Sequence, residues 1–402
     1  MTLKKVKLQD VCISIADGDH QAPPKANKGV PFVTISNITN TNQFDFSSTM
    51  FVSQEYYENL DSKRKAQAGD ILYSVVGSFG IPVYMKSNIP FVFQRHIAIL
   101  RPDVEKITPI FLYYIMLNRD FYMKADAAAI GAAQRTISLT ALRNMEIEVP
   151  NIEKQKKIAE ILSTYDDLIE NNKKQIKLLE EAAQRFYKEW FVNLRFPGYE
   201  DVKIVDDVPE GWTNGTLGDI SFFKRGKTIT KAQIQDGDVP VVAGGLEPAY
   251  YHNKSNTFAP VITVSGSGAN AGFARLYNVN VFASDCSFAD SKTTPFLYFV
   301  YCFIKDNKQS FDALQKGSAQ PHVYAKDINA LKLSIPTEVL LESFCELVSP
   351  YFEKIKVLQN QIGLSSQARD RLLPKLMSGE IEISPFSKGN GYDSSQGDFR
   401  EV

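Results

Sequence analysis

The longest regular pattern in the chain is a hydrophobic repeat of seven residues that begins near residue 154. No Gly or Pro interrupts residues 154–191. Apolar side chains there alternate at spacings of four and three, as the a and d positions of a coiled coil do. The pattern predicts a helix about 48 Å long from residue 158 to 190. Its seam is Ile158, Leu162, Tyr165, Ile169, Asn172, Ile176, Leu179 and Phe186.

A second seam with the same spacing lies near the end of the chain. It breaks at Ser365 and Arg369, and Pro374 is expected to end or kink this helix. Helices this long need a long partner, so we expect the two to pack on each other in antiparallel fashion. The alternative is that each packs only on its own globular part. The second seam comprises Phe344, Val348, Tyr351, Ile355, Leu358, Ile362 and Leu372.

Asn172 is the polar member of the first seam. A buried polar residue in a seam can fix the register of two helices. The same residue could instead lie at the edge of the seam, and the sequence leaves both interpretations open.

The chain also repeats itself. The stretch "GAAQRTIS" (131–138) returns as "GSAQPHVY" (317–324), 186 positions later. The match continues without a gap over about sixty residues and includes the two seams. Further upstream, "KLQDV" (7–11) resembles "TLGDI" (216–220) at an offset of 209. Two copies with so long a period indicate a duplication rather than a solenoid.

The front part of each copy alternates apolar and polar residues in short runs typical of strands. One internal helix is expected in each, starting at Pro109 and Pro295, because proline suits a first helical turn. The fold class is therefore α+β, with two mixed α/β domains, two long antiparallel coiled-coil helices and pseudo-two-fold symmetry. The predicted strands are 31–36, 71–76, 91–100, 145–150, 239–244, 260–265 and 331–336.

Composition narrows the function classes. At 402 residues the chain is expected to form two or three domains. The net charge is −1, which does not by itself point to nucleic acid. The four cysteines contain no CxxC pair and the four histidines show no metal-ligand spacing, so we expect no metal site. The longest apolar run, 296–304, is too short to span a bilayer. We expect a cytoplasmic protein without membrane contact.

The loops between the strands hold the candidate binding residues. They are rich in Gly, which lets a backbone approach a ligand, and in Lys and Arg, which can meet phosphates. Asn, Gln and Arg can also read base edges. The alternative is that these are ordinary surface turns. The candidates for DNA contact are Asp19, His20, Lys25, Ser78, Arg95, Gln134, Arg135, Arg225, Lys227, Thr228, Lys231, Ser267, Asn270, Gln320 and His322.

Catalytic motifs are missing from the sequence. "GSGANAG" (266–272) approaches a dinucleotide fingerprint but lacks the third glycine at the right place and the acidic residue that should follow. There is no P-loop, no stretch of the kind that amino-methyltransferases use to hold a flipped base, and no nuclease carboxylate layout. We therefore expect neither a cofactor nor a catalytic role.

Three stretches resemble the specificity subunits of type I restriction–modification systems. Residues 150–198 are similar to that family's central conserved region. "VPEGWTNGTLGDI" (208–220) resembles the opening of its second target recognition domain, and "ARDRLLPKLMSGEI" (368–381) resembles its C-terminal conserved region. The resemblance covers nearly the whole chain. The weakened seam at Ser365 and Arg369 departs from it and puts the packing of the second helix in doubt.

The resemblance implies a domain plan and a set of partners. The two recognition domains would read the halves of a bipartite site on double-stranded DNA. Two methyltransferase subunits and the restriction–translocase subunits would bind the chain and carry the chemistry. The alternative is a two-headed coiled-coil scaffold that binds proteins and not DNA. The expected domains are recognition domain 1 (1–150), a spacer helix (151–196), a linker with recognition domain 2 (197–336), a second spacer helix (337–378) and a tail (379–402).

Overall fold

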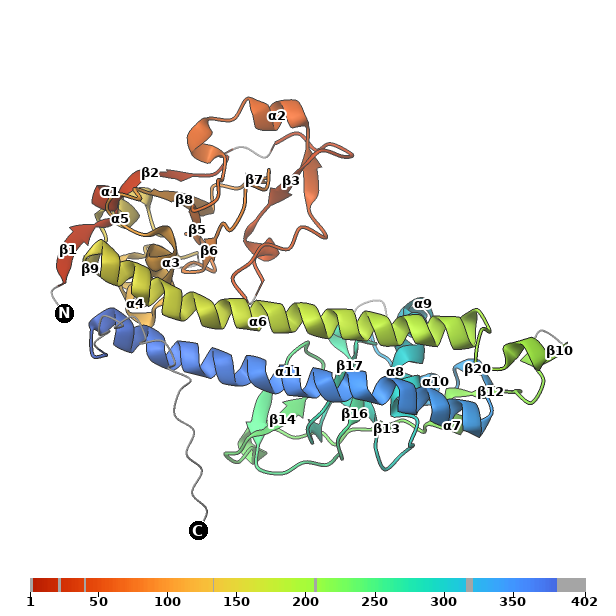
Figure 1. The fold of residues 1–402 in the computed structure, drawn as a ribbon. Helices are drawn as coiled ribbons and strands as arrows, with labels where there is room; N and C mark the ends of the chain where they lie inside the picture. The colour runs from red at the N-terminus through yellow and green to blue at the C-terminus, as the bar shows by residue number, and fades with distance from the viewer. Residues whose placement is uncertain are drawn as a thin grey trace, which may run out of the picture. The chain divides into compact units, whose positions relative to one another are not determined.

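The structure is a computed structural model that describes residues 3–20, 23–39, 41–132, 134–205, 208–315 and 321–381. Its contacts divide the chain into two compact units. Unit 1 holds Met1–Ile169 and Leu364–Val402, and unit 2 holds Glu170–Gly363. Helices α6 (Ile152–Tyr187) and α11 (Glu338–Ser378) are continuous, and each contributes one part to each unit (Figure 1). The boundary between the units thus cuts both long helices.

Unit 1 contains two small sheets and a strand pair. The larger sheet is antiparallel with the order β2-β8-β5-β6. In the second, of order β4-β3-β7, β3 and β7 are parallel. Strand β1 pairs with β9. The elements are β1 (Lys4–Lys7), α1 (Leu8–Val11), β2 (Cys12–Asp17), β3 (Val30–Val33), η1 (Ile35–Asn37), β4 (Met50–Val52), α2 (Gln54–Glu58), η2 (Ser62–Arg64), β5 (Ile71–Ser74), β6 (Pro82–Tyr84), β7 (Val92–Phe93), β8 (Ile97–Pro102), α3 (Pro109–Leu117), α4 (Arg119–Ala128), α5 (Leu139–Asn144) and β9 (Glu146–Val149).

Unit 2 repeats this topology. Its four-stranded antiparallel sheet has the order β13-β19-β16-β17, and its three-stranded sheet, β15-β14-β18, also contains one parallel pair. Strand β12 pairs with β20, and β10 pairs with β11. The elements are η3 (Lys188–Val192), η4 (Tyr199–Asp201), β10 (Ile204–Val205), β11 (Val208–Pro209), β12 (Thr213–Thr216), α7 (Leu217–Ile220), β13 (Lys224–Arg225), η5 (Lys231–Gln233), β14 (Val239–Val242), β15 (Tyr250–His252), β16 (Val261–Ser265), η6 (Gly268–Asn270), β17 (Ala274–Tyr277), β18 (Phe282–Ala283), β19 (Cys286–Asp290), α8 (Leu297–Asp306), α9 (Lys308–Ala313), α10 (Ala325–Asn329) and β20 (Lys332–Ile335).

The repeated motif near the start of each unit forms the same short helix. The leucines of "KLQDV" and "TLGDI", Leu8 and Leu217, begin α1 and α7 and are fully buried. In α7 the carboxylate of Asp219 accepts hydrogen bonds from the backbone nitrogen and the hydroxyl of Thr216, both at 2.8 Å. This caps backbone donors that would otherwise be unpaired at the helix start.

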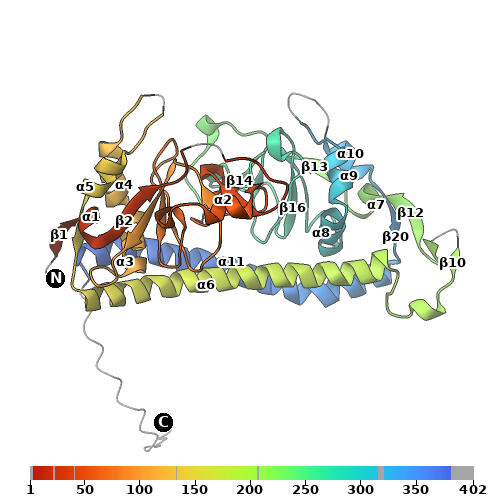
Figure 2. The same cartoon turned by 90° about the horizontal axis from the view of Figure 1, so that it is seen from above.

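In each unit a helix lies between the four-stranded sheet and the long helices (Figures 1 and 2). In unit 1 the helix is α3, whose Phe111 shares a core with Leu100 of β8 and Ile158 of α6. In unit 2 it is α8, whose Val300 shares a core with Ile262 of β16. Burial of such side chains supplies most of the favourable free energy of folding.

Within each unit, α6 and α11 run antiparallel. In unit 1, Asp166 of α6 accepts a hydrogen bond from Arg369 of α11 at 2.6 Å. In unit 2, Asn172 donates to Gln361 at 3.3 Å, and the Phe186 ring stacks on Tyr351 at 6.3 Å. Residues later in the sequence of α6 therefore contact residues earlier in the sequence of α11, as in an antiparallel pair.

The predicted seam residues are all buried or half-buried. Asn172 is buried, as the register interpretation requires. Pro374 does not end the helix, because α11 continues to Ser378. Pro374 is exposed and lies within the last two turns of the helix.

A second apolar face of the long helices was not predicted. Phe352 is buried, and its ring stacks on that of Tyr298 of α8 at 4.3 Å and 5°. Tyr187 is buried against Phe299 in the same unit. The long helices thus pack on the globular part of their unit as well as on each other.

The predicted strands and helices are mostly found, with local shifts. The stretch 91–100 is interrupted at residues 94–96 and forms β7 and β8. Helix α3 begins at Pro109 as predicted, whereas α8 begins at Leu297, two residues after Pro295. Several strands, among them β2, β6, β17 and β19, were missed because their runs are short or contain polar residues.

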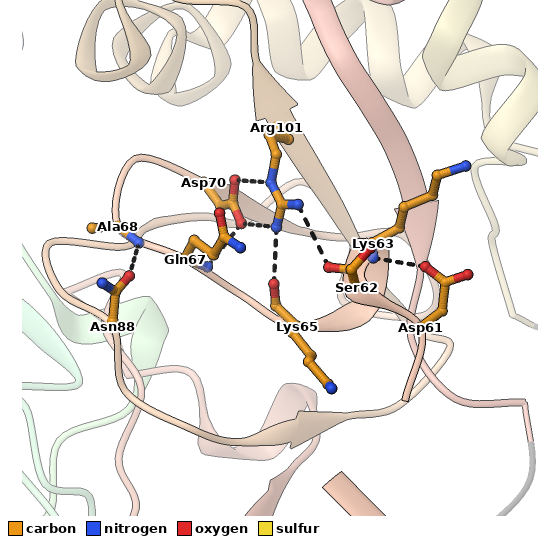
Figure 3. A network of polar contacts seen from close by, with 9 residues as sticks. All are labelled: Asp61, Ser62, Lys63, Lys65, Gln67, Ala68, Asp70, Asn88 and Arg101. Atoms are coloured by element: carbon orange, nitrogen blue, oxygen red, sulfur yellow. Dashed lines mark hydrogen bonds and ion pairs between the residues drawn. The ribbon is translucent and has the colours of Figure 1, made fainter. Parts of the chain in front are cut away.

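A buried ion pair ties an irregular segment of unit 1 to its sheet (Figure 3). Asp70 is almost fully buried, and Arg101 of β8 donates to both of its carboxylate oxygens, at 3.0 and 2.8 Å. The same guanidinium donates to the carbonyl of Lys65 at 2.9 Å. Two charges buried together in this bidentate geometry satisfy each other, whereas either alone would be costly.

Candidate nucleic-acid interface

The candidate residues of unit 1 come from loops at one edge of the four-stranded sheet. Strand β2 ends there at Asp17, β5 ends at Ser74, and β8 begins at Ile97. Because neighbouring strands in this sheet are antiparallel, these three termini share an edge. The loops that follow or precede them hold Asp19, His20, Ser78 and Arg95.

Backbone hydrogen bonds join these loops. The amide of Arg95 donates to the carbonyl of Asp19 at 2.9 Å. The amide of Gly77 donates to the carbonyl of Arg135 at 2.9 Å, and that of Ile137 to Val75 at 2.8 Å. The loop 131–138 is therefore attached to the turn after β5, and the positive φ of Gly77 (+70°) suits that turn.

Unit 2 builds the corresponding edge with the same connections. The amide of Gly268 donates to the carbonyl of Pro321, and that of Val323 donates to Gly266, both at 3.1 Å. Lys227 donates through its amide to Ala283 at 2.9 Å. The repeated loop thus pairs with the turn after β16 as its counterpart pairs with the turn after β5.

Most candidate side chains at the two edges are exposed. Their cationic and amide groups are available to phosphates and base edges. Gln320 lies outside the described residues. The exposed candidates are His20, Lys25, Ser78, Arg95 and Gln134 in unit 1, and Arg225, Lys227, Thr228 and Lys231 in unit 2.

Two candidates of unit 1, Asp19 and His20, already have partners within the unit. His20 lies 2.8 Å from the carboxylate of Asp17, and Asp19 accepts a hydrogen bond from the hydroxyl of Tyr56. Burial, together with the bond to Asp19 and its charge, raises the pKa of Tyr56 to about 12. This tyrosine therefore stays protonated at neutral pH and can only donate to Asp19.

Arg135 is anchored by the helix before it. Its guanidinium pairs with the carboxylate of Asp126 of α4, donates to the carbonyl of Ala129 at 3.4 Å, and lies 5.6 Å from the centre of the Phe79 ring. These contacts give Arg135 a structural role in holding the loop. About 41% of its side chain remains accessible, which leaves room for a contact with a ligand.

The half-buried candidates of unit 2 are also connected. The hydroxyl of Ser267 donates to the carboxylate of Asp285, and Asn270 donates to the carbonyl of Gly244 at 3.4 Å. The His322 ring stacks on that of Tyr324 at 6.0 Å. These contacts orient the turn, the 242–248 loop and the repeated loop.

Several residues at the edges were not predicted. Tyr56 and Asp285 hold candidate side chains in place, and Arg64 lies 3.8 Å from Asp17. Tyr56 meets Asp19 across 37 positions of sequence. Nothing in the local sequence pattern of either residue indicates so distant a contact.

The described residues contain no cluster of His, Cys, Asp or Glu that could hold a metal ion. The four thiols are unpaired, and burial is the main cause that raises the pKa of each. Over the part of the chain that the structure describes, no helix is both long and apolar enough to cross a membrane.

The fold defines a class of protein with two copies of one α/β module joined by shared long helices. A family model described as "Type I restriction modification DNA specificity domain" matches residues 2–181 and 209–339, so the chain belongs to the family of type I restriction–modification specificity subunits. Target recognition on DNA is the general function of this family, and its members are the non-catalytic subunits of these systems.

Two curated relatives come from Methanocaldococcus jannaschii. The type I restriction enzyme MjaIX specificity subunit is 29% identical over 68% of this chain and 69% of its own length. The putative MjaX specificity subunit is 24% identical over 94% of this chain and 93% of its own. A crystal structure of the type I S subunit from M. genitalium covers 94% of this chain and 96% of its own with a TM-score of 0.57. At 18% identity, that last likeness shows the fold alone.

Proposed function

We propose that the chain reads a bipartite DNA target, one half-site through the edge of unit 1 and the other through the edge of unit 2. The observation that carries this proposal is the repeated edge. The same backbone hydrogen bonds hold the turn and the loop together in both units, while the exposed side chains differ. A shared backbone arrangement that carries different side chains suits two domains that bind different DNA sequences.

The chemistry of each edge supports contact with a duplex. In unit 1, Gln134 and Arg95 offer donors that can pair with base edges, and Lys25 can meet a phosphate. In unit 2, Arg225 is the last residue of β13, and Lys227 lies in the loop that follows. Because the net charge of the chain is −1, we expect partner subunits to supply part of the attraction to the backbone.

Domain exchange tests the proposal directly. Residues 1–150 would be replaced by the first domain of another family member, and DNA methylation would be mapped in cells that also express the methyltransferase subunit. We expect one half-site to change and the other to stay. The reciprocal exchange of residues 197–336 is the matched control and should change the other half-site. If either exchange alters both half-sites, or neither, the assignment of one half-site to each unit is wrong.

We further propose that α6 and α11 bind two methyltransferase subunits at repeat-related positions. Leu178 of α6 and Leu364 of α11 are 186 positions apart and occupy equivalent places in the duplication. Their side chains are 64% and 68% exposed. Exposed leucines at matching positions fit two copies of one partner, because each copy would meet the same local surface.

Substitution of these leucines separates docking from folding. Leu178→Asp and Leu364→Asp should each lower the amount of methyltransferase subunit that co-purifies, and the double variant should abolish it. Val104→Asp is the control, because Val104 is 62% exposed but lies in the loop before α3 and not on a long helix. Equal co-purification for all three variants would exclude this surface. We expect the restriction–translocase subunits to join the complex of the chain with its methyltransferase subunits.

A two-headed protein scaffold remains the second candidate function. It would bind proteins at the same edges and show no affinity for DNA. A salt titration decides between the two, because replacement of counterions by Lys and Arg makes DNA affinity fall steeply with ionic strength. Absence of salt-dependent binding to any duplex by the complex with the methyltransferase subunit would favour the scaffold.

A further inference from the structure

A cavity of about 350 Å³ opens at the edge of unit 2. Its walls come from the turn after β16, the end of α8 and helix α9. Both apolar and charged groups line it, and the side chain of Phe273 is 40% exposed. The residues that matter here are Asn270, Ala271, Phe273, Lys305, Lys308 and Asp312.

The equivalent place in unit 1 is filled. The Phe79 ring stacks on that of Tyr122 at 5.8 Å and 8°. The guanidinium of Arg135 lies 5.6 Å from the centre of the Phe79 ring and pairs with the carboxylate of Asp126. Two planar rings, a planar cation and a carboxylate therefore form one cluster.

The duplication identifies the counterparts of this cluster. At the offset of 186 positions, Asp126 corresponds to Asp312, Tyr122 to Lys308, and Arg135 to Pro321. Unit 2 thus keeps the carboxylate but has no tyrosine ring and no guanidinium at the matching positions.

The counterpart of Phe79 in unit 2 is identified from the hydrogen bonds of the turn that contains it. Phe79 precedes Gly80, whose amide donates to the carbonyl at the end of β5 at 2.9 Å. Ala271 precedes Gly272, whose amide donates in the same way to the end of β16 at 2.9 Å. An alanine in place of the phenylalanine leaves the space that the ring occupies in unit 1.

A nucleotide has the chemistry to replace the missing groups. Its base is planar and can stack on an exposed aromatic ring such as Phe273. The exocyclic amino group of adenine, cytosine or guanine can donate to a carboxylate, as a guanidinium does to Asp126. Lys305 and Lys308 can meet the phosphate. The volume lies within the range of small-molecule pockets.

We propose that this cavity holds one base of the DNA target, turned out of the duplex stack. Asp312 accepts a hydrogen bond from the exocyclic amino group of that base, and Lys305 and Lys308 meet its phosphate. The inference rests on the proposed function, since it needs DNA at the edge of unit 2. It also predicts specificity, because thymine has no exocyclic amino group and can offer Asp312 only its ring N3–H.

The test uses the complex of the chain with its methyltransferase subunit, on duplexes that carry the target mapped by methylation. The fluorescent base 2-aminopurine is placed at each position of the unit 2 half-site in turn, because its emission rises when it leaves the stack. Apart from any base that the methyltransferase subunit extrudes, we expect one position to brighten several-fold on binding. Ala271→Phe should abolish this signal by filling the cavity as Phe79 does in unit 1. A base extruded by the methyltransferase subunit should brighten with the native chain and with the Ala271→Phe variant alike, so it serves as an internal control.

A second variant covers the case in which Ala271→Phe misfolds. Asp312 is exposed, and Asp312→Asn preserves its shape. The native complex should bind a duplex with thymine at the bright position about tenfold more weakly, and Asp312→Asn should reduce that preference while recognition of the unit 1 half-site stays unchanged. If the target is bound but no position brightens, if the signal survives Ala271→Phe, or if Asp312→Asn keeps the full preference, the cavity does not hold a base. Failure to bind the mapped target at all would overturn the proposed function as well.

Discussion

The break in the second seam at Arg369 leads to a measurable prediction about unit 1. Arg369 donates to one carboxylate oxygen of Asp166 at 2.6 Å, and the hydroxyl of Tyr114 donates to the other at 2.6 Å. The side chains of Arg369 and Asp166 are only 23% and 22% exposed. Burial and the charge of Asp166 raise the pKa of Tyr114, so its hydroxyl stays a donor.

The size of the effect follows from these contacts. A hydrogen bond to a charged group contributes about 1.5–3 kcal/mol to stability, and removing one partner of a buried pair leaves a charge uncompensated. Asp166→Ala removes two such bonds and leaves the half-buried Arg369 paired with the more exposed Asp370. We expect it to lower the free energy of unfolding of unit 1 by about 3 kcal/mol. Tyr114→Phe should cost about half as much.

A double-mutant cycle measured by urea unfolding of the full chain isolates the pair. Asp166→Ala, Arg369→Ala and the double variant should give a coupling energy of about 1–2 kcal/mol. The matched control is Asp167, which pairs with Lys86 at 3.3 Å through side chains that are 70% and 49% exposed. Asp167→Ala should change stability by no more than about 0.5 kcal/mol. If Asp166→Ala costs no more than Asp167→Ala, the contact does not stabilise the pairing of α6 with α11.

Two further predictions concern backbone geometry and thiol chemistry. Gly80 and Gly268 both have positive φ, +91° and +79°, but a Cβ at Gly80 would lie 2.5 Å from the Tyr122 ring while nothing lies within 4 Å of one at Gly268. Thermal unfolding should therefore show a loss of about 1–2 kcal/mol for Gly268→Ala and clearly more for Gly80→Ala; equal losses would contradict the close approach of the Tyr122 ring to Gly80. Burial raises the pKa of the Cys286 thiol to about 12, so at pH 8 it stays protonated. Mass spectrometry should find Cys286 unmodified by iodoacetamide in the native chain and modified in urea, and similar rates in both would refute its burial.

The sequence predicted the long helices and the duplication because both leave periodic signals. A seam needs apolar residues at fixed spacing, and a duplicated segment keeps its offset. The second face of the helices has no such independent signal. Phe352 and Tyr187 each lie one position away from a seam residue, and only the presence of α8 makes their burial necessary.

The candidate interface was predicted residue by residue but not as a site. Composition singled out loops with Gly, Lys and Arg, and the structure gathers those loops at one sheet edge in each unit. The antiparallel pairing that does so joins residues far apart in sequence, such as Asp17 and Ala98. The anchoring of Arg135 by Asp126 is likewise absent from the local pattern, although the two residues are only nine positions apart.

The comparison of the two edges indicates how one fold could serve the two half-sites that we propose. The turn and the repeated loop are connected through backbone amides and carbonyls. These hydrogen bonds are therefore present in both units, although unit 2 has Pro321 in place of Arg135 and Ala271 in place of Phe79. Proline lacks an amide hydrogen, yet Pro321 contributes only its carbonyl to these hydrogen bonds. The stability of each unit comes from the core beneath the edge, where α3 or α8 meets the long helices. Side chains at the edge can therefore change with little cost to folding, and that freedom is what divergence of sequence recognition between two copies of one module requires.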